Sequence, residues 1–265
     1  MLERSNDIVL LAGLPRTGST LLQNILAQNP KFHSEGNSAL CQVMGDVKGS
    51  CENNAIQQLT GVNKDVSFKR DLLRKIPDIY YPEIEDKVIL DKTRTWIQEE
   101  NLLMAREHIK QDIKSIIMVR PVDEIIASFA RVSIENNKHF DYVSFLSDEN
   151  DLMREMTVTY YAAKSKDPSF IFVPYDELVL NPNKTLSQIY KHIGLKPFHH
   201  NVQKITQTVF EDDERNDMIG MHKIRSKIAK QKNKIVLPDW VKHQSDEITR
   251  TIFNEINTFK LKEVA

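Results

Sequence analysis

The sequence predicts an α/β protein with a central parallel β-sheet that is flanked by helices. Two observations predict this class. Short apolar runs, typical of strands buried on both faces, recur at residues 8–12, 88–90, 113–119 and 170–173. Segments with helical apolar spacing lie between and after these runs, as in a sheet built from crossover units. The chain is 40% hydrophobic and 28% charged, which fits one globular domain over residues 1–265.

The first apolar run leads directly into residues 13–20, GLPRTGST, which we call the phosphate loop. Its spacing matches the P-loop frame G-x-x-x-x-G-K-[ST], but Ser19 stands at the lysine position and Arg16 supplies a cation inside the loop. Backbone N–H groups at a helix start still bind an anion. The loop therefore predicts a phosphate site that is not built for Mg-ATP. An ordinary strand–turn–helix is the alternative.

The helix that follows the phosphate loop is expected to end at Asn29-Pro30, because the residue before proline disfavours the α region. The third apolar run ends at Arg120, and residues 122–131 have a helical pattern with acids in the first turn. Ser128 lies on that helix. An arginine at a strand end suits phosphate, since its planar fork bonds oxygens in pairs. A salt bridge between Arg120 and Asp123 is the alternative.

The segment from Leu14 to Leu22 resembles the 5′-phosphosulfate loop of sulfotransferases that use 3′-phosphoadenosine 5′-phosphosulfate (PAPS). It looks most like the branch with tyrosylprotein sulfotransferases and related bacterial enzymes. The resemblance implies the P-loop-like sulfotransferase fold and in-line sulfuryl transfer from PAPS to a hydroxyl acceptor. It also implies adenosine 3′,5′-bisphosphate (PAP) as product and no metal. The loop residues that it places around the 5′-phosphosulfate are Pro15, Arg16, Thr17, Gly18, Ser19 and Thr20.

Further positions follow from the same resemblance. Arg120 and Ser128 are similar to the family's 3′-phosphate site, which distinguishes PAPS from ordinary adenine nucleotides. The fourth apolar run leads into a Y-x-E-L-type segment, which implies that Tyr175 lies near the nucleotide. A tyrosine that caps the core with its hydroxyl at the rim is the alternative.

The transfer needs a base that takes the acceptor's proton. Several relatives carry a catalytic glutamate after the first helix, and Glu35 is the favoured candidate here. An ungapped alignment places the glutamate position on Asn37, so the loop must shift by two residues. His33 is the competing base, because imidazole exchanges protons near neutral pH.

Positive charge is also needed where the bridging oxygen departs. The resemblance implies this role for Lys92, in the segment 91–94 that follows the second apolar run, with Arg94 as a second candidate. Relatives often cover the phosphates with a late basic segment, and Lys223 and Arg225 begin such a run here. A solvated helix face, offset by the acidic stretch 211–214, is the alternative.

The whole chain has 36 Lys and Arg against 37 Asp and Glu, a net charge of −1. We therefore expect neither a nucleic-acid nor a membrane partner, and attraction for an anionic donor must be local. Residues 1–7 carry no signal-peptide pattern, so we expect a cytoplasmic protein with free Cys41 and Cys51.

The acceptor is expected to be a small molecule or a peptide hydroxyl, in a pocket walled by the polar segments 38–80, 132–166 and 196–238. The aromatic residues expected there are Phe68, Tyr80, Tyr81, Phe140, Tyr142 and Phe145. Two other functions stay open. A P-loop kinase or NTPase would need Asp91 as its metal-binding aspartate, and an inactive nucleotide-binding module would retain the loop without a base.

Overall fold

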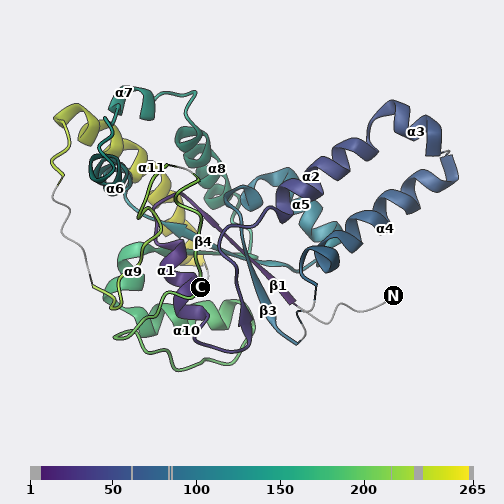
Figure 1. The fold of residues 1–265 in the computed structure, drawn as a ribbon, viewed down its shortest axis with the longest axis horizontal. Coiled ribbons are helices and arrows are strands. Elements are labelled where there is room, and N and C mark those ends of the chain that lie inside the picture. Colours follow the sequence, from purple (N-terminus) through teal and green to yellow (C-terminus); the bar gives the residue numbers. More distant parts are fainter. Residues whose placement is uncertain are drawn as a thin grey trace.

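The computed structural model describes residues 7–60, 62–82, 84, 86–215, 217–229 and 235–262. Within them, five parallel strands form one sheet with the order β2-β3-β1-β4-β5 (Figure 1). The strands are β1 (Asp7–Gly13), β2 (Phe32–His33), β3 (Val88–Lys92), β4 (Lys114–Val119) and β5 (Phe170–Pro174). The four expected strands are all present. The edge strand β2 was not expected, because two residues are too few to form an apolar run.

Alternation along β1 divides the core into two layers. Ile8, Leu10 and Ala12 pack into the cluster on one face of the sheet. Val9 and Leu11 pack into the cluster on the other face. All five side chains are buried, which explains why the strand has a continuous apolar run rather than alternating polar residues.

Helices cover both faces. The larger cluster takes residues from α2 (Leu40–Cys51), α4 (Val62–Tyr80), the 3₁₀ turn η1 (Arg94–Ile97), α5 (Glu99–His108), α6 (Val122–Glu135), α8 (Asp151–Ser165) and α11 (Asp239–Lys262). The opposite cluster takes residues from α1 (Ser19–Leu26), α9 (Tyr175–Leu180) and α10 (Pro182–His192). The remaining helices are α3 (Asn54–Thr60) and α7 (Tyr142–Phe145). The expected α/β class is confirmed.

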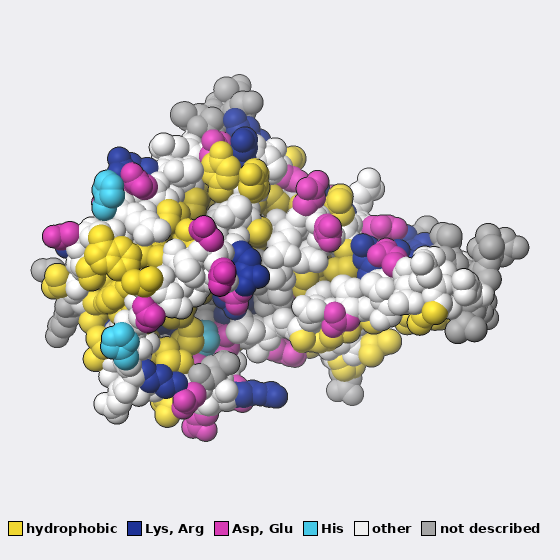
Figure 2. All heavy atoms as spheres, turned by 90° about the horizontal axis from the view of Figure 1, so that it is seen from above, with side chains coloured by type: hydrophobic (Ala, Val, Ile, Leu, Met, Phe, Trp, Pro, Cys, Tyr) yellow, Lys and Arg dark blue, Asp and Glu magenta, His cyan; other side chains and the backbone are white. Residues whose placement is uncertain are grey.

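Helices α2, α3 and α4 form an arm that projects from the body of the molecule (Figure 1). Seen from above, the arm extends away from the body and carries hydrophobic side chains on its surface (Figure 2). Its large exposed apolar residues are Val43, Ile56, Phe68 and Ile79. Most of residues 38–80 belong to this arm, so they project away from the part of the sheet where the phosphate loop lies.

Helix α1 ends at Leu26, three residues before the expected stop. The N–H of Gln28 bonds the carbonyl of Ile25 at 3.1 Å, and the N–H of Asn29 bonds that of Leu26 at 2.9 Å. The chain thus tightens into a 3₁₀-type turn before Pro30. Cys41 and Cys51 are buried free thiols. Within the described part of the chain, no helix is both long and apolar enough to cross a membrane.

Because the strands are parallel, their carboxyl ends share one edge of the sheet. Gly13, Lys92, Val119 and Pro174 end β1, β3, β4 and β5 at this edge. Lys92 stands at one of these strand ends, and Arg16, Arg120 and Tyr175 lie within three residues after the others, so the parallel topology brings them to the same edge of the sheet.

Candidate active site

A cavity of about 580 Å³ lies at this edge, within the size range of pockets that hold nucleotide-sized ligands. The phosphate loop, the ends of β3 and β4, α6 and residues 218–229 line it. The expected site residues in its lining are Pro15, Arg16, Gly18, Ser19, Thr20, Lys92, Arg120, Ser128, Tyr175, Lys223 and Arg225. Thr17, His33 and Glu35 are not among the lining residues.

The phosphate loop owes its shape to three residues. Gly18 has φ +88°, and a Cβ there would lie 2.7 Å from Cδ2 of Tyr175. Arg16 also has a left-handed backbone, with φ +60°. The buried Thr17 hydroxyl donates to the carbonyl of Leu14 at 2.6 Å, so Thr17 braces the loop from within. Only a residue without Cβ fits at Gly18, because the tyrosine ring packs directly against it.

The two arginines that were expected to bind phosphate lie side by side. The Arg120 guanidinium donates from Nη1 to the backbone carbonyl of Arg16 at 3.1 Å. The Arg16 guanidinium donates from Nε to the hydroxyl of Ser128 at 3.1 Å and from Nη1 to the carbonyl of Met221. Burial, together with nearby Arg131 and Arg120, lowers the pKa of Arg16 to about 10. These cations repel one another, and an anion between them relieves that repulsion.

Arg120 is held by α6 and α9. Its Nε donates to the carboxylate of Glu124 at 2.8 Å, one residue beyond the expected partner Asp123. Its guanidinium also lies 4.3 Å from the centre of the Tyr175 ring. Burial raises the pKa of Tyr175, so the ring stays neutral and acts as a platform between Arg120 and Gly18.

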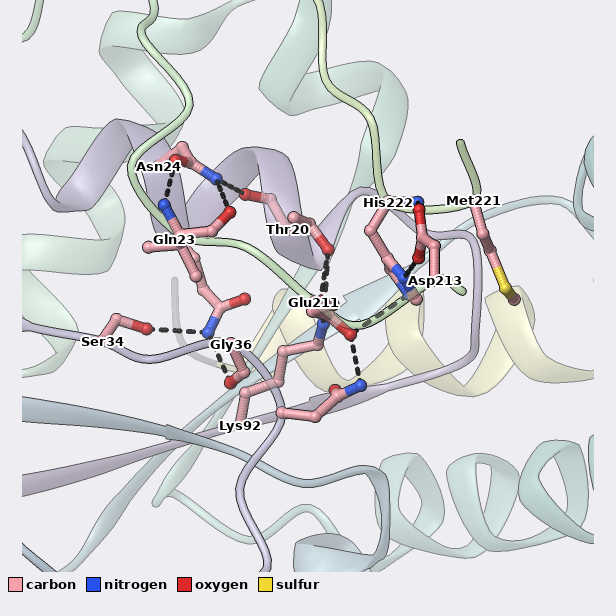
Figure 3. A network of polar contacts seen from close by, with 12 residues as sticks. Thr20, Gln23, Asn24, Ser34, Gly36, Lys92, Glu211, Asp213, Met221 and His222 are labelled. Atoms are coloured by element: carbon pink, nitrogen blue, oxygen red, sulfur yellow. Dashed lines mark hydrogen bonds and ion pairs between the residues drawn. The ribbon is translucent and has the colours of Figure 1, made fainter. Parts of the chain in front are cut away.

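Lys92 points into a polar network around Glu211 (Figure 3). Its Nζ lies 2.5 Å from the Glu211 carboxylate and 3.3 Å from the hydroxyl of Thr20. The same carboxylate accepts from Thr20 at 2.9 Å and from the amide of Asn37. The Lys92 and Glu211 side chains are only 7% and 4% exposed. Burial lowers the pKa of Lys92, and the charge of Glu211 opposes that shift.

Glu211 also contacts His222, whose Nε2 lies 3.2 Å from the carboxylate. The other ring nitrogen, Nδ1, lies 2.5 Å from the carboxylate of Asp213. Sequence reasoning missed these three residues, because the acidic stretch 211–214 was interpreted as a charge balance for the later basic run. The available signal was a histidine directly before that run, eleven residues after a glutamate.

His33 and Glu35 pair with each other at 2.6 Å, and the Glu35 side chain is 57% exposed. Within the segment 33–37, Asn37 lines the cavity, and this is the position that the ungapped alignment gives for the catalytic glutamate. The backbone between them is fixed, since Gln23 donates to the carbonyl of Gly36 at 3.0 Å. A catalytic role for Glu35 or His33 stays a prediction that requires this segment to move.

Asp91, the metal-binding candidate of the kinase alternative, is buried and fully hydrogen-bonded within the fold. Its carboxylate accepts from Ser38 at 2.6 Å, from Trp96 at 2.6 Å and from Tyr81 at 2.8 Å. Burial raises its pKa. These bonds use both carboxylate oxygens of Asp91 to join β3 to neighbouring residues of the fold. Because the oxygens are occupied in this way, Asp91 is a poor metal ligand and the kinase alternative is not favoured.

Aromatic side chains form one wall of the cavity. Phe145 lies between Phe129 and Phe140, with ring centroids 4.8 Å from each, and all three line the cavity. Tyr142 packs on Phe140 at 5.0 Å without appearing in the lining. Phe68, Tyr80 and Tyr81 are also absent from the lining, and Phe68 is exposed on the arm. The aromatic wall therefore consists of Phe129 of α6 and of Phe140 and Phe145 from the expected segment 132–166, whereas the aromatic residues named in the segment 38–80 do not line the cavity.

Comparisons with known proteins agree with this architecture. A model of the sulfotransferase family matches residues 9–200. The sulfotransferase domain of an olefin synthase from Synechococcus PCC 7002 is 17% identical, with 93% of this chain and 94% of that chain covered and a TM-score of 0.52. A sulfotransferase from Alicyclobacillus acidocaldarius is 10% identical, with 97% and 96% covered and a TM-score of 0.54.

The sulfotransferase domain from the curacin biosynthetic pathway is 17% identical, with 93% of this chain and 97% of that chain covered and a TM-score of 0.50. No curated protein sequence matches the chain. At these identities the structural likenesses establish the fold, while the family match extends over more than half of the sequence. The chain belongs to the sulfotransferase family.

Proposed function

We propose that the protein transfers a sulfuryl group from PAPS to a hydroxyl acceptor and releases PAP. The observation that carries this proposal is the charge of the cavity. Eight of the described residues in its lining are Lys or Arg, and none of those lining residues is Asp or Glu. The whole chain, by contrast, has a net charge of −1. Such local concentration of cations fits a ligand with several anionic groups, because it focuses the field on the cavity.

Two groups of residues take the two ends of the donor. The phosphate loop, with Arg16, Ser19 and Thr20, receives the 5′-phosphosulfate at the start of α1. Arg120 and Ser128 receive the 3′-phosphate, and Arg225 and Lys223 approach from the later segment. The Arg16–Ser128 bond joins the two groups in the structure, so donor phosphates would compete for both side chains.

Lys92 is proposed to stabilise negative charge on the departing bridging oxygen. It ends β3 beside the Thr20 hydroxyl, which places one ammonium and one hydroxyl at the same point of the phosphate loop. The proposed acceptor is a small-molecule or peptide hydroxyl with an apolar body. Phe129, Phe140 and Phe145 offer that body an aromatic wall.

Thermal unfolding with added nucleotides tests the donor assignment. PAP is expected to raise the melting temperature more than 5′-AMP does, and Mg-ATP is expected to have little effect, because a ligand that binds only the folded state stabilises it. Transfer is then measured with ³⁵S-labelled PAPS and a panel of phenols, alcohols and tyrosine peptides. Stabilisation by Mg-ATP without stabilisation by PAP would contradict the proposal and favour a kinase.

A further inference from the structure

The described residues 205–215 and 217–228, which we call the late segment, are held against the phosphate-loop helix α1. Asn24 of α1 accepts hydrogen bonds through its side-chain oxygen from the N–H groups of Thr208 at 2.6 Å and Val209 at 2.9 Å. Ile205 and Ile228, the ends of the segment, are buried in the cluster that contains α1. These anchors hold the late segment beside α1, and the segment places Glu211, Asp213 and His222 near Thr20 of the phosphate loop (Figure 3).

The Asp213 carboxylate contacts both the backbone and the ring of His222. Asp213 accepts from the backbone N–H of His222 at 2.9 Å through Oδ2, and its Oδ1 lies 2.5 Å from Nδ1 of the ring. Both oxygens of Asp213 thus act on one residue. This arrangement fixes the ring and directs Nε2 toward Glu211, and His222 lines the cavity whereas His33 does not.

The Glu211 carboxylate marks the place of an anion. It is held by the ammonium of Lys92 and the hydroxyl of Thr20 on one side and by His222 Nε2 on the other. A sulfuryl group bound at the phosphate loop would interact with the same two groups, the ammonium of Lys92 and the hydroxyl of Thr20. Glu211 and the donor therefore compete for these two groups, and donor binding requires the carboxylate to leave.

We propose that His222 is the general base of the transfer and that Asp213 is its positioning residue. The inference rests on the proposed function. The acceptor oxygen forms a bond to sulfur while the bond from sulfur to the bridging oxygen of the 5′-phosphate breaks. That oxygen keeps the electron pair and leaves with PAP. The acceptor's proton passes to Nε2 of His222, and Asp213 stabilises the imidazolium that results.

Departure of Glu211 also explains how the base becomes available. In the structure both ring nitrogens face carboxylates, Nε2 facing Glu211 and Nδ1 facing Asp213, so the Glu211 contact keeps an acceptor hydroxyl away from Nε2. Once the donor replaces Glu211, the Nδ1–H bond to Asp213 leaves the lone pair on Nε2. The other charges near the ring are Arg16, which donates to the carbonyl of Met221, and Lys92, which reaches it through Glu211.

The test compares acceptors of different acidity. Phenol needs a base near neutral pH, whereas 4-nitrophenol is far more acidic and ionises without help. Loss of a general base typically costs at least about 100-fold in rate. We expect His222→Gln to lower the consumption of PAPS with phenol by about 100-fold or more, and to lower it with 4-nitrophenol far less. Affinity for PAP, measured by calorimetry, should stay within about threefold, the scatter of a surface substitution.

Matched variants separate the roles. Asp213→Asn should lower kcat with phenol and leave the KM for PAPS unchanged, and Asp213→Glu should recover part of the loss. The double variant should be no slower than His222→Gln, because both residues act through one proton transfer. His243→Gln, an exposed histidine on α11 that also faces a glutamate, serves as the control and should match the wild type.

Each contrary result overturns a stated claim. If His222→Gln slows both phenols equally, or loses PAP binding, His222 is not the base. If the phenol-selective loss appears in Glu35→Gln or Glu211→Gln instead, that carboxylate takes the proton. A wild-type protein that neither binds PAP nor consumes PAPS removes the proposed function itself. If the wild type binds PAP and consumes PAPS but His222→Gln is as fast as the wild type with phenol, the role of His222 is refuted and the proposed function stands.

Discussion

Glu211→Gln is the substitution whose effect the structure predicts most sharply. The side chain is 4% exposed and its carboxylate lies 2.5 Å from Nζ of Lys92, which is 7% exposed. The amide of glutamine keeps an oxygen that accepts from Lys92 and Thr20, but it removes the negative charge. The variant thus leaves a buried ammonium without its counter-charge and also removes the competitor of the donor.

The magnitude follows from burial. Removal of one partner of a buried ion pair costs about 3–5 kcal/mol, and the retained hydrogen bonds place this variant near 3 kcal/mol. For a chain of this size that free energy of unfolding corresponds to a melting temperature lower by about 6–12 °C. PAP brings an anion to the same ammonium and hydroxyl. When PAP binds, its phosphate supplies the missing counter-charge. Recovery of about 1.4 kcal/mol of the lost free energy in this way makes PAP bind about tenfold more tightly to the variant than to the wild type.

The assay is thermal unfolding with and without saturating PAP, with PAP affinity measured by calorimetry. The difference in melting temperature between variant and wild type should narrow when PAP is present. Glu214→Gln, an exposed carboxylate on the same late segment, is the control and should behave as the wild type. A variant that is destabilised as expected but binds PAP no more tightly than the wild type refutes the claim that Glu211 occupies the donor's place.

Three other substitutions test the site and the fold. Arg120→Ala should weaken PAP about 10- to 100-fold and 5′-AMP far less, as calorimetry will show, because a charged hydrogen bond contributes about 1.5–3 kcal/mol. Equal losses would count against the 3′-phosphate assignment. Gly18→Ala should lose about 2 kcal/mol in denaturant unfolding and bind PAP more weakly, since φ is +88° and the new Cβ meets Tyr175 at 2.7 Å. An unchanged midpoint would contradict this packing. Asp91→Asn should be less stable than the wild type at acid pH, and the gap should shrink as pH rises. Burial raises the folded-state pKa of Asp91, so its contribution is present below the unfolded pKa and is lost as pH rises through the folded pKa. A gap that grows with pH would reverse this sign.

Local pattern was sufficient wherever a residue is placed by its own strand. Arg16, Arg120 and Tyr175 follow β1, β4 and β5, and Lys92 ends β3. All four line one cavity because parallel strands end at the same edge. The spacing of the phosphate loop likewise predicted a helix start directly after the loop, and α1 begins at Ser19. These positions depend on periodicity and topology, both of which are written in short stretches of sequence.

Pattern was insufficient where a residue is placed by contacts made far along the chain. Glu211 reaches Lys92 across 119 residues and Thr20 across 191, through a late segment that has no helical or strand period. Hydrogen bonds to Asn24 and the burial of Ile205 and Ile228 hold that segment in place. The charge pattern of the segment, on which its interpretation relied, does not indicate these contacts. The arm is a second case, because α2 and α4 pack on each other as well as on the sheet, and this packing carries Phe68 away from the cavity.

The sequence by itself determined the parallel sheet, the phosphate loop with serine at the usual lysine position and an arginine inside the loop, and the cluster of cations at the strand ends. Strand periodicity and loop spacing are local, so they need no knowledge of distant contacts. Only the tertiary structure decided which carboxylate lies against Lys92 and which histidine faces the phosphate loop. Those neighbours meet because an irregular segment is anchored to α1, and such anchoring arises from packing and hydrogen bonds that no local pattern encodes.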